Sequence, residues 1–349
     1  MKCSCGGTSY LSPDVYMAGA NDSRMACEHC GEDIHFGPAV AGLRDGDDPA
    51  LRDETVNLLA WYHTSTSSDW PSEGFATRST EEVSRIEHDI GISQERYIAE
   101  HTTKALHVGT YETAIENMLR RMHDQLDGKS QFYLYRVALH LEPGRINRGY
   151  RDENHEIAAD VRVMDLESDG LDAVRYLNVH EAAGVLSLAV RPGAIVAVQS
   201  LPIPLETFAV AVDPSLFRTQ INEVRAAKTA LTEAEVVIAA LAPVERRMME
   251  FGMRPDPGGL AKRAGRLQRR VYDSRDQLEQ RLARLCLPNT SAVVRKDFNY
   301  AMAHRQDDDS DAGLHEFVER YRSMAFLLEQ STDVMEMLTV QPWRVVNSR

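Results

Sequence analysis

Three short segments of the chain combine residue types that could do chemistry on a bound small molecule. They read WYHTST at 61–66, LHVGT at 106–110 and YLNVHE at 176–181. Each could begin or end a short strand, and each places a His, Thr, Asn or Glu beside apolar residues. Polar groups at strand ends, supplied by distant parts of one chain, are how a rigid scaffold builds a small-molecule site. The His and Thr side chains could hydrogen-bond a ligand, and the carboxylate of Glu181 could offset positive charge on it.

A second group of residues suits a metal ion. Four of the five cysteines lie in the first 30 residues, as the close pairs Cys3, Cys5 and Cys27, Cys30. Two close pairs separated by about twenty residues favour a structural zinc ribbon, in which four thiolates complete a tetrahedral site. The alternative is four unliganded surface thiols. We expect residues 1–40 to form a zinc ribbon whose metal supplies its folding energy, because so small a segment buries no core.

The elements that must position the three segments lie in a mixed region at 55–212. Runs rich in β-branched and aromatic residues predict short strands at 59–63, 105–108, 132–141, 174–178, 185–190 and 194–198. Helices are predicted at 79–103 and 111–127. In the second helix the apolar residues recur at helical spacing, at Ala114, Ile115, Met118, Leu119 and Met122. Strands outnumber helices and follow one another closely late in the region, which predicts an α+β fold.

After residue 213 the pattern becomes helical. Long helices are predicted at 215–252 and 260–286, separated by a Pro- and Gly-rich breaker at 254–259, and a third at 311–339. The second keeps near-heptad apolar spacing through Leu260, Ala264, Leu267, Val271, Leu278 and Leu285. This spacing predicts the seam of a helical hairpin or coiled coil, so residues 213–349 are expected to form a helical domain for packing or dimerisation. Cys286 is expected to be a small buried apolar residue of this domain.

In their order and contents, the three segments resemble the NAD-dependent ADP-ribosyltransferases of the His-Tyr-Glu class. Residues 62–66 are similar to the first-strand Tyr-His-Gly-Thr motif, with Thr64 where many relatives have Gly. Residues 106–110 are similar to a form found in phage and bacterial members, and His107 stands where other members have a Tyr that stacks on nicotinamide. Residues 176–181 resemble a Tyr-x-Asn-x-x-Glu signature whose Glu is catalytic. The resemblance covers roughly residues 58–200.

The resemblance implies a split, mostly antiparallel sheet with NAD bound in its cleft. Glu181 would orient the ribose and stabilise an oxocarbenium-like transition state, as carboxylates do in glycoside chemistry. His63 would bind the adenosine ribose and His107 the nicotinamide. Asp172 is a weaker second carboxylate. Further contacts to NAD are expected from Thr64, Thr66, Gly109, Thr110, Tyr176, Asn178 and Ser187.

The function implied is mono-ADP-ribosyl transfer from NAD to a macromolecule, with DNA or RNA favoured over protein, in a toxin or phage-defence effector. One alternative enzyme is a tRNA 2′-phosphotransferase-like protein, which needs arginines such as Arg136, Arg145 and Arg148 to converge. Another alternative has no catalysis: a zinc-ribbon adaptor that binds a partner through its helical hairpin.

Bulk composition sets the remaining expectations. The 349 residues allow two or three domains, and a hydrophobic content of 43% is enough for a packed core. The chain has no long apolar run and no signal-like start, so we expect a cytosolic protein without a membrane span. The net charge is −14, yet residues 244–306 hold 14 Lys and Arg against 7 Asp and Glu. This basic segment either faces phosphate or is a solvated helical surface.

Overall fold

The computed structural model describes residue 5 and residues 7–9, 24–31, 33–35, 42–71, 104–124, 130–153, 158–205, 208–250, 259–303 and 310–346. The chain divides into two compact units. The first comprises Met1–Ile203, Ser291–Asp297 and Ser331–Arg349, and the second comprises Pro204–Thr290 and Phe298–Gln330. The expected helix at 79–103 and the expected ligand Cys3 lie outside the described residues.

A short hairpin carries two of the expected metal ligands near the N-terminus. Strands β1 (Arg24–Ala26) and β2 (Asp33–His35) pair antiparallel, with Arg24 opposite His35. Cys27 and Cys30 lie in the turn between them. Gly31 follows with φ +74°, a left-handed conformation that favours glycine.

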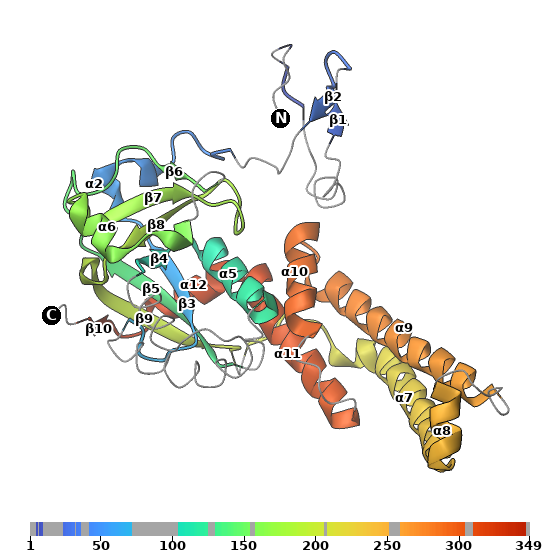
Figure 1. Ribbon diagram of the computed structural model, residues 1–349. Helices are drawn as coiled ribbons and strands as arrows, with labels where there is room; N and C mark the ends of the chain where they lie inside the picture. The colour runs from blue at the N-terminus through green and yellow to red at the C-terminus, as the bar shows by residue number, and fades with distance from the viewer. Residues whose placement is uncertain are drawn as a thin grey trace. The chain divides into compact units, whose positions relative to one another are not determined.

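Two four-stranded sheets form the centre of the first unit (Figure 1). One has the order β10-β9-β5-β3, made by Arg344–Val345, Ile195–Ile203, Phe132–Leu139 and Trp61–Ser65, and is antiparallel throughout. The other has the order β4-β8-β7-β6, made by Leu106–Val108, Leu186–Val190, Ala173–Leu177 and Arg151–Asp152. In the second sheet only the β6–β7 pair is parallel. The first unit is therefore α+β, as predicted. Each of the six predicted strands is present; five have ends that differ by at most two residues, whereas β9 continues to Ile203 beyond its predicted end at 198.

The two sheets are joined at one point along their edges. Tyr62 of β3 and Gly109, just after β4, exchange both backbone hydrogen bonds, at N···O distances of 2.8 and 3.0 Å. A Cβ on Gly109 would lie 2.5 Å from the Ser187 hydroxyl oxygen and 2.9 Å from Thr113 Cβ. Only glycine fits this junction without a shift of its neighbours, which explains its place in LHVGT.

One apolar core lies between the sheets. It joins Trp61, Tyr135 and Val137 of the first sheet to Val108, Leu177 and Leu188 of the second. A second cluster covers the other face of β7 and β8, so both strands are buried throughout. Its members are Ala105, Ala158, Val161, Leu166, Val174, Tyr176 and Ala189, which include residues of the 3-10 helix η3 (Ala158–Asp160) and of α6 (Val163–Ser168).

Helix α5 (Tyr111–Asp124) packs against β3. Its buried residues include all five apolar positions predicted from helical spacing, Ala114, Ile115, Met118, Leu119 and Met122, together with Tyr111 and Thr113. The Thr64 hydroxyl donates to the carbonyl of Ala114 at 3.0 Å, and Tyr62 meets Tyr111 edge-on. These contacts fix one face of the helix against the strand that carries His63.

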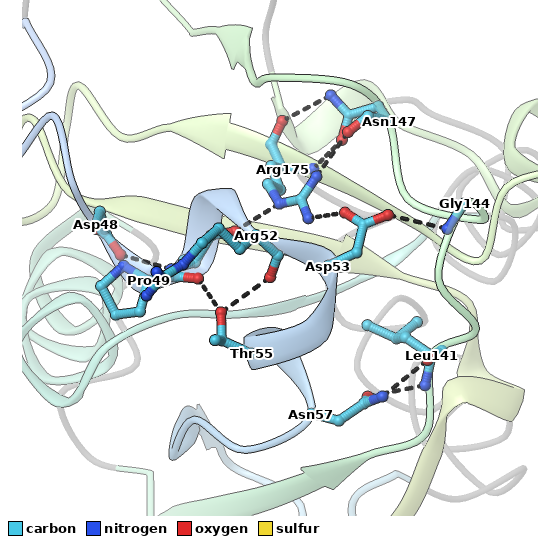
Figure 2. Close-up of polar contacts among 11 residues, drawn as sticks. Asp48, Pro49, Arg52, Asp53, Thr55, Asn57, Leu141, Gly144, Asn147 and Arg175 are labelled. Carbon is cyan, nitrogen blue, oxygen red and sulfur yellow. Dashed lines mark hydrogen bonds and ion pairs between the residues drawn. The ribbon is translucent and has the colours of Figure 1, made fainter.

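A buried polar network secures the segment before β3 to β7 (Figure 2). Arg175, 1% exposed, forms an ion pair with Asp53 and donates to the carbonyls of Ala50 and Asn147. Asp53 begins the short helix α2 (Asp53–Val56), which follows the 3-10 helix η1 (Pro49–Leu51). The partners satisfy the guanidinium, so Arg175 has a structural role.

The second unit contains the helical hairpin predicted from the heptad spacing. Helices α7 (Arg218–Ala239) and α9 (Leu260–Cys286) lie side by side (Figure 1), packed through Ala227, Leu231 and Val271. Cys286 is buried, as expected. The prediction of one continuous helix at 215–252 is wrong. The structure has two helices here, since α7 ends at Ala239 and α8 spans Pro243–Glu250. The break falls at Pro243 because proline suits the first turn of a helix rather than its interior. The unit also contains the 3-10 helix η5 (Pro214–Phe217) and α11 (Asp311–Glu329).

The C-terminal part departs further from expectation. The predicted helix at 311–339 is two helices, α11 and α12 (Ser331–Thr339), separated at Gln330, and α10 (Ala292–Ala303) was not predicted. Residues from Ser331 onward group with the first unit, although the sequence placed them in the helical domain. The reason is that β10 pairs with β9, while the Gln199 side chain donates to the carbonyls of Thr339 and Gln341. No helix in the described part of the chain has the length and apolar character needed to cross a membrane.

Candidate functional site

The loop that carries Glu181 connects β7 to β8 and is closed by backbone hydrogen bonds. Asn178 N donates to Val185 O and Gly184 N donates to Asn178 O, both at 2.9 Å. Ala182, next to Glu181, has φ +43°, an uncommon conformation for a residue with a side chain. Gly184 has φ +88°, and a Cβ there would lie 2.5 Å from the Gly42 carbonyl oxygen. This tight loop holds Glu181 in a defined place.

Helix α5 holds the Glu181 carboxylate. Arg120 Nε donates to Glu181 Oε1 at 2.6 Å, and Asn117 Nδ2 donates to the same oxygen at 3.1 Å. Glu181 is 7% exposed, whereas the Arg120 side chain is 44% exposed. Within the described residues, Glu181 Oε2 accepts no hydrogen bond. One carboxylate oxygen is thus fixed by the protein and the other is available to a ligand.

Two further carboxylates bind the same loop. Glu116 of α5 accepts a hydrogen bond from Ala182 N at 2.6 Å, and Glu153 accepts one from Val179 N at 3.1 Å. Burial raises the pKa of both carboxyls, and the charge of Glu181 adds to the effect. Neither residue was predicted from the sequence. The helical spacing of Glu116, Asn117 and Arg120 signals one polar face of α5, but only the fold shows that this face meets Glu181.

A chain of side chains connects β4, β7 and β8. The His107 Nδ1 lies 3.1 Å from the Tyr176 hydroxyl, and Asn178 Nδ2 donates to the Ser187 hydroxyl oxygen at 2.8 Å. The Ser187 hydroxyl also bonds Tyr176, which links the two pairs. Asn178, 1% exposed, leaves its Oδ1 without a hydrogen-bond partner in the described residues. A buried acceptor without a donor is costly, so this atom is suited to a donor from a ligand.

Burial holds His107 in its neutral form. The Ser187 hydroxyl accepts from Asn178 Nδ2, and His107 Nδ1 shares one hydrogen bond with the Tyr176 hydroxyl. Burial lowers the pKa of His107 to about 4, although the charge of Glu181 opposes the shift. The ring is therefore neutral at pH 7.

A backbone carbonyl fixes the tautomer of His63. Its Nδ1 lies 2.8 Å from the His107 carbonyl oxygen, which can only accept, so the proton is on Nδ1 and Nε2 is an acceptor. The ring stacks on Trp70 at a centroid distance of 4.0 Å. Burial lowers the pKa of His63 to about 3, so this ring is also neutral. The two expected catalytic histidines are thus adjacent through one backbone carbonyl.

Two of the three threonines expected to contact NAD form hydrogen bonds within the fold. Thr64 is buried, and its hydroxyl is used by α5. Thr110 caps the start of α5, where its hydroxyl accepts from Thr113 N at 3.3 Å and its carbonyl accepts from Ala114 N. Thr66 follows the end of β3 and is partly buried.

The structure separates the other charged candidates from Glu181. Asp172, at the start of β7, forms ion pairs with Arg145 and Arg191, which satisfies its carboxylate. Arg136 bonds Gln199 and lies over the ring of Trp343. A 2′-phosphate site would need these arginines to converge, whereas Arg136 and Arg145 have different partners.

Three of the four expected metal ligands are brought together. The sulfur atoms of Cys5, Cys27 and Cys30 lie within 4.8 Å of one another, a cluster that could hold a metal ion. Cys27 Sγ accepts hydrogen bonds from His29 N at 3.4 Å and from the Ser9 hydroxyl at 3.7 Å. Chiefly because of the His29 amide, the pKa of Cys27 is lowered to about 6, which favours the thiolate that metals bind.

Comparison with protein-family models, with curated proteins and with solved structures found no match. The function is therefore inferred from the residues of the site.

Proposed function

We propose that the first unit is an NAD-dependent mono-ADP-ribosyltransferase in which Glu181 is the catalytic carboxylate. The observation that carries the proposal is the state of this side chain. It is buried, its Oε1 is fixed by Arg120 and Asn117, and its Oε2 has no protein partner in the described chain. A carboxylate held in this way stabilises positive charge on a ligand without having to reorganise.

In the proposed reaction the bond between nicotinamide N1 and ribose C1′ breaks, and its electron pair leaves with nicotinamide. Positive charge develops on the ribose ring, near Glu181, as in glycoside cleavage. The acceptor nucleophile then forms a bond to C1′ and loses its proton. Glu181 Oε2 would accept a hydrogen bond from a ribose hydroxyl.

The neighbouring groups fit a ligand that donates hydrogen bonds. His63 offers an Nε2 acceptor and Asn178 a buried acceptor, and the neutral His107 ring lies beside them. In this proposal His63 binds the adenosine ribose and His107 lies at the nicotinamide, where a relative would place a Tyr. Gly109 and Tyr176 position His107, while Ser187 and Asn178 orient Tyr176. Two sheets joined at one bridge support the split-sheet fold of these transferases.

Zinc is the metal that we propose for the cysteine cluster, with Cys3 as fourth ligand. Cysteine thiolates are the preferred donors of structural zinc, and the amide hydrogen bonds to sulfur fit such a site. When bound, the metal would supply folding energy to the β1–β2 hairpin. We also propose a cytoplasmic protein and, by resemblance alone, a toxin or phage-defence role.

Transfer of label from NAD tests the activity. Full-length chain would be incubated with ³²P-labelled NAD in a bacterial lysate, beside Glu181→Gln and the matched control Glu112→Gln. Glu112 lies exposed on α5, so the control makes the same chemical change away from the carboxylate cluster. We expect label in macromolecules with wild type and the control, and none with Glu181→Gln. Nuclease and protease digestion would then identify the acceptor class.

The alternative function, a zinc-ribbon adaptor without catalysis, predicts a different result. It predicts neither labelling nor nicotinamide release by any variant, together with partner binding that Glu181→Gln leaves unchanged. Equal labelling by wild type and Glu181→Gln would contradict the assignment of this carboxylate.

A further inference from the structure

We infer that the first turns of α9 form a docking surface for the phosphate backbone of a nucleic acid. Five cations make up this surface, which we call the basic face: Lys262, Arg263, Arg266, Arg269 and Arg270, all exposed. No Asp or Glu occurs at 260–272. The inference concerns binding and stands apart from catalysis; combined with the proposed transferase, it assigns a nucleic acid as acceptor.

The rest of the α7–α9 hairpin carries acidic and basic residues in equal number. Residues 273–286 of α9 hold three acidic and three basic residues, and α7 also holds three of each. Mixed charge is sufficient for solubility. The basic face departs from this composition within a single helix, so solvation alone does not account for it.

The basic face also carries internal repulsion. Lys262, Arg266 and Arg270 are spaced i, i+4, and like charges at this spacing destabilise a helix. Within the described ranges, the side chains of Arg263, Arg266, Arg269 and Arg270 form no ion pair. A polyanion on this face would relieve the repulsion.

Arginine and geometry favour phosphate as the partner group. Four of the five cations are Arg, whose planar guanidinium binds phosphate in a bidentate manner. The face extends about 12 Å along the helix, the length of about three base-pair steps of a duplex. Tyr272, three residues after Arg269, is 62% exposed and offers a ring on which a base could stack.

The packing of α9 argues against a lipid surface. A helix that binds a membrane inserts its apolar face between lipids. In α9 that face is already used, because Val271 and Leu278 are buried and Val271 packs on Ala227 and Leu231 of α7. The basic face therefore has no apolar side to insert with it.

Binding of a labelled oligonucleotide tests the inference. The full chain would be titrated into a fluorescein-labelled 25-nucleotide RNA, and separately a 25-base-pair DNA duplex, at 50 to 200 mM NaCl, with anisotropy as the readout. The test variant is Arg263→Gln, Arg266→Gln, Arg270→Gln. The control variant, Arg218→Gln, Arg225→Gln, Arg284→Gln, removes the same charge from exposed positions of α7 and of the mixed part of α9.

We expect wild type and control to bind with Kd values within threefold of each other. The test variant should bind at least tenfold more weakly. Its slope of log Kd against log salt should fall by about 2.7 on the duplex and about 2.1 on the RNA, since each phosphate contact contributes about 0.9 on B-DNA and about 0.7 on a single strand. Its melting temperature should be unchanged or slightly higher, because repulsion is removed. Equal loss in both variants, or no binding of either oligonucleotide by wild type, would overturn the inference.

Discussion

At the scale of single residues, hydrogen bonds hold the groups of the site in place. Tyr176 holds His107, Asn178 holds Ser187, and the His107 carbonyl fixes the proton of His63 on Nδ1. Glu181 is held through one oxygen by α5. These contacts prearrange an acceptor and a carboxylate before any ligand binds, which is the condition for electrostatic stabilisation of a transition state.

The Arg120–Glu181 pair should show strong coupling. Arg120→Met leaves a buried carboxylate with one donor, and we expect a loss of about 1–3 kcal/mol in the free energy of unfolding. Removing the charge as well, in Arg120→Met with Glu181→Gln, should restore about half of that loss. Urea unfolding of the four proteins measures the coupling, and strictly additive effects would contradict a paired arrangement.

The neutral histidines should make stability depend on pH. An unfolded His binds a proton near pH 6.5, whereas burial holds the pKa of His107 at about 4, so stability is full above pH 6.5 and falls as the pH drops toward 4. The raised pKa values of Glu116 and Glu153 have the opposite effect, since they make the folded state less stable as the pH rises. A variant is therefore needed to isolate the contribution of His107 to the pH dependence.

We expect His107→Gln to lose less stability between pH 7.5 and 5.0 than wild type, by up to about 2 kcal/mol. The exposed His140 provides the control variant, His140→Gln, which should behave as wild type. Urea unfolding at the two pH values gives the result. Identical pH dependence of wild type and His107→Gln would show that the ring is not held neutral by the fold.

At the scale of elements, the sequence predicted the features that depend on neighbouring residues, such as strand positions and the buried faces of helices. The buried face of α5 follows from apolar periodicity, the six strands follow from β-branched and aromatic runs, and α9 begins just after the Pro- and Gly-rich breaker. The placement of Glu116, Asn117 and Arg120 beside Glu181 could not be read from spacing, because it depends on how α5 packs after β4. Thr64 and Thr110 were expected to contact NAD. In the structure the Thr64 hydroxyl donates to the Ala114 carbonyl of α5, and the Thr110 hydroxyl accepts from Thr113 N at the start of the same helix.

The junction of β3 and β4 should tolerate no side chain at Gly109. Gly109→Ala places a Cβ within 3 Å of Ser187 and Thr113, and we expect a loss of about 1–3 kcal/mol in stability from overpacking. Gly193 has open space around the Cβ position, so Gly193→Ala is the control and should be near neutral. Thermal unfolding compares the two variants. Equal melting temperatures would mean that the β3–β4 junction can open without loss of stability.

At the scale of the whole molecule, the chain is not a simple series of domains. The segment from Ser331 onward returns to the first unit, where β10 adds a strand to β9 and Arg344 donates to the Trp70 carbonyl. Such long-range returns leave no local pattern in the sequence. Charge is also divided along the chain, with the basic face of α9 set in an acidic protein.

The metal content should belong to the N-terminal cysteines alone. Purified chain should contain one zinc ion per molecule by elemental analysis, and Cys27→Ser or Cys30→Ser should lose it. Cys286→Ser, a change at a buried residue of α9, should keep it. A Cys3→Ser variant tests the fourth ligand. Full zinc content in Cys27→Ser and Cys30→Ser would contradict the site.

The most direct test of the central claim is nicotinamide release by the purified chain. Wild type, Glu181→Gln and Glu112→Gln would each be incubated with NAD, with and without a lysate as the source of acceptor, and nicotinamide would be measured by chromatography. We predict release by wild type and Glu112→Gln, and at least a hundredfold lower rate for Glu181→Gln at unchanged thermal stability. Equal release by Glu181→Gln, or no release by any of the three with acceptor present, would contradict the assignment of Glu181 as the catalytic carboxylate of an ADP-ribosyltransferase.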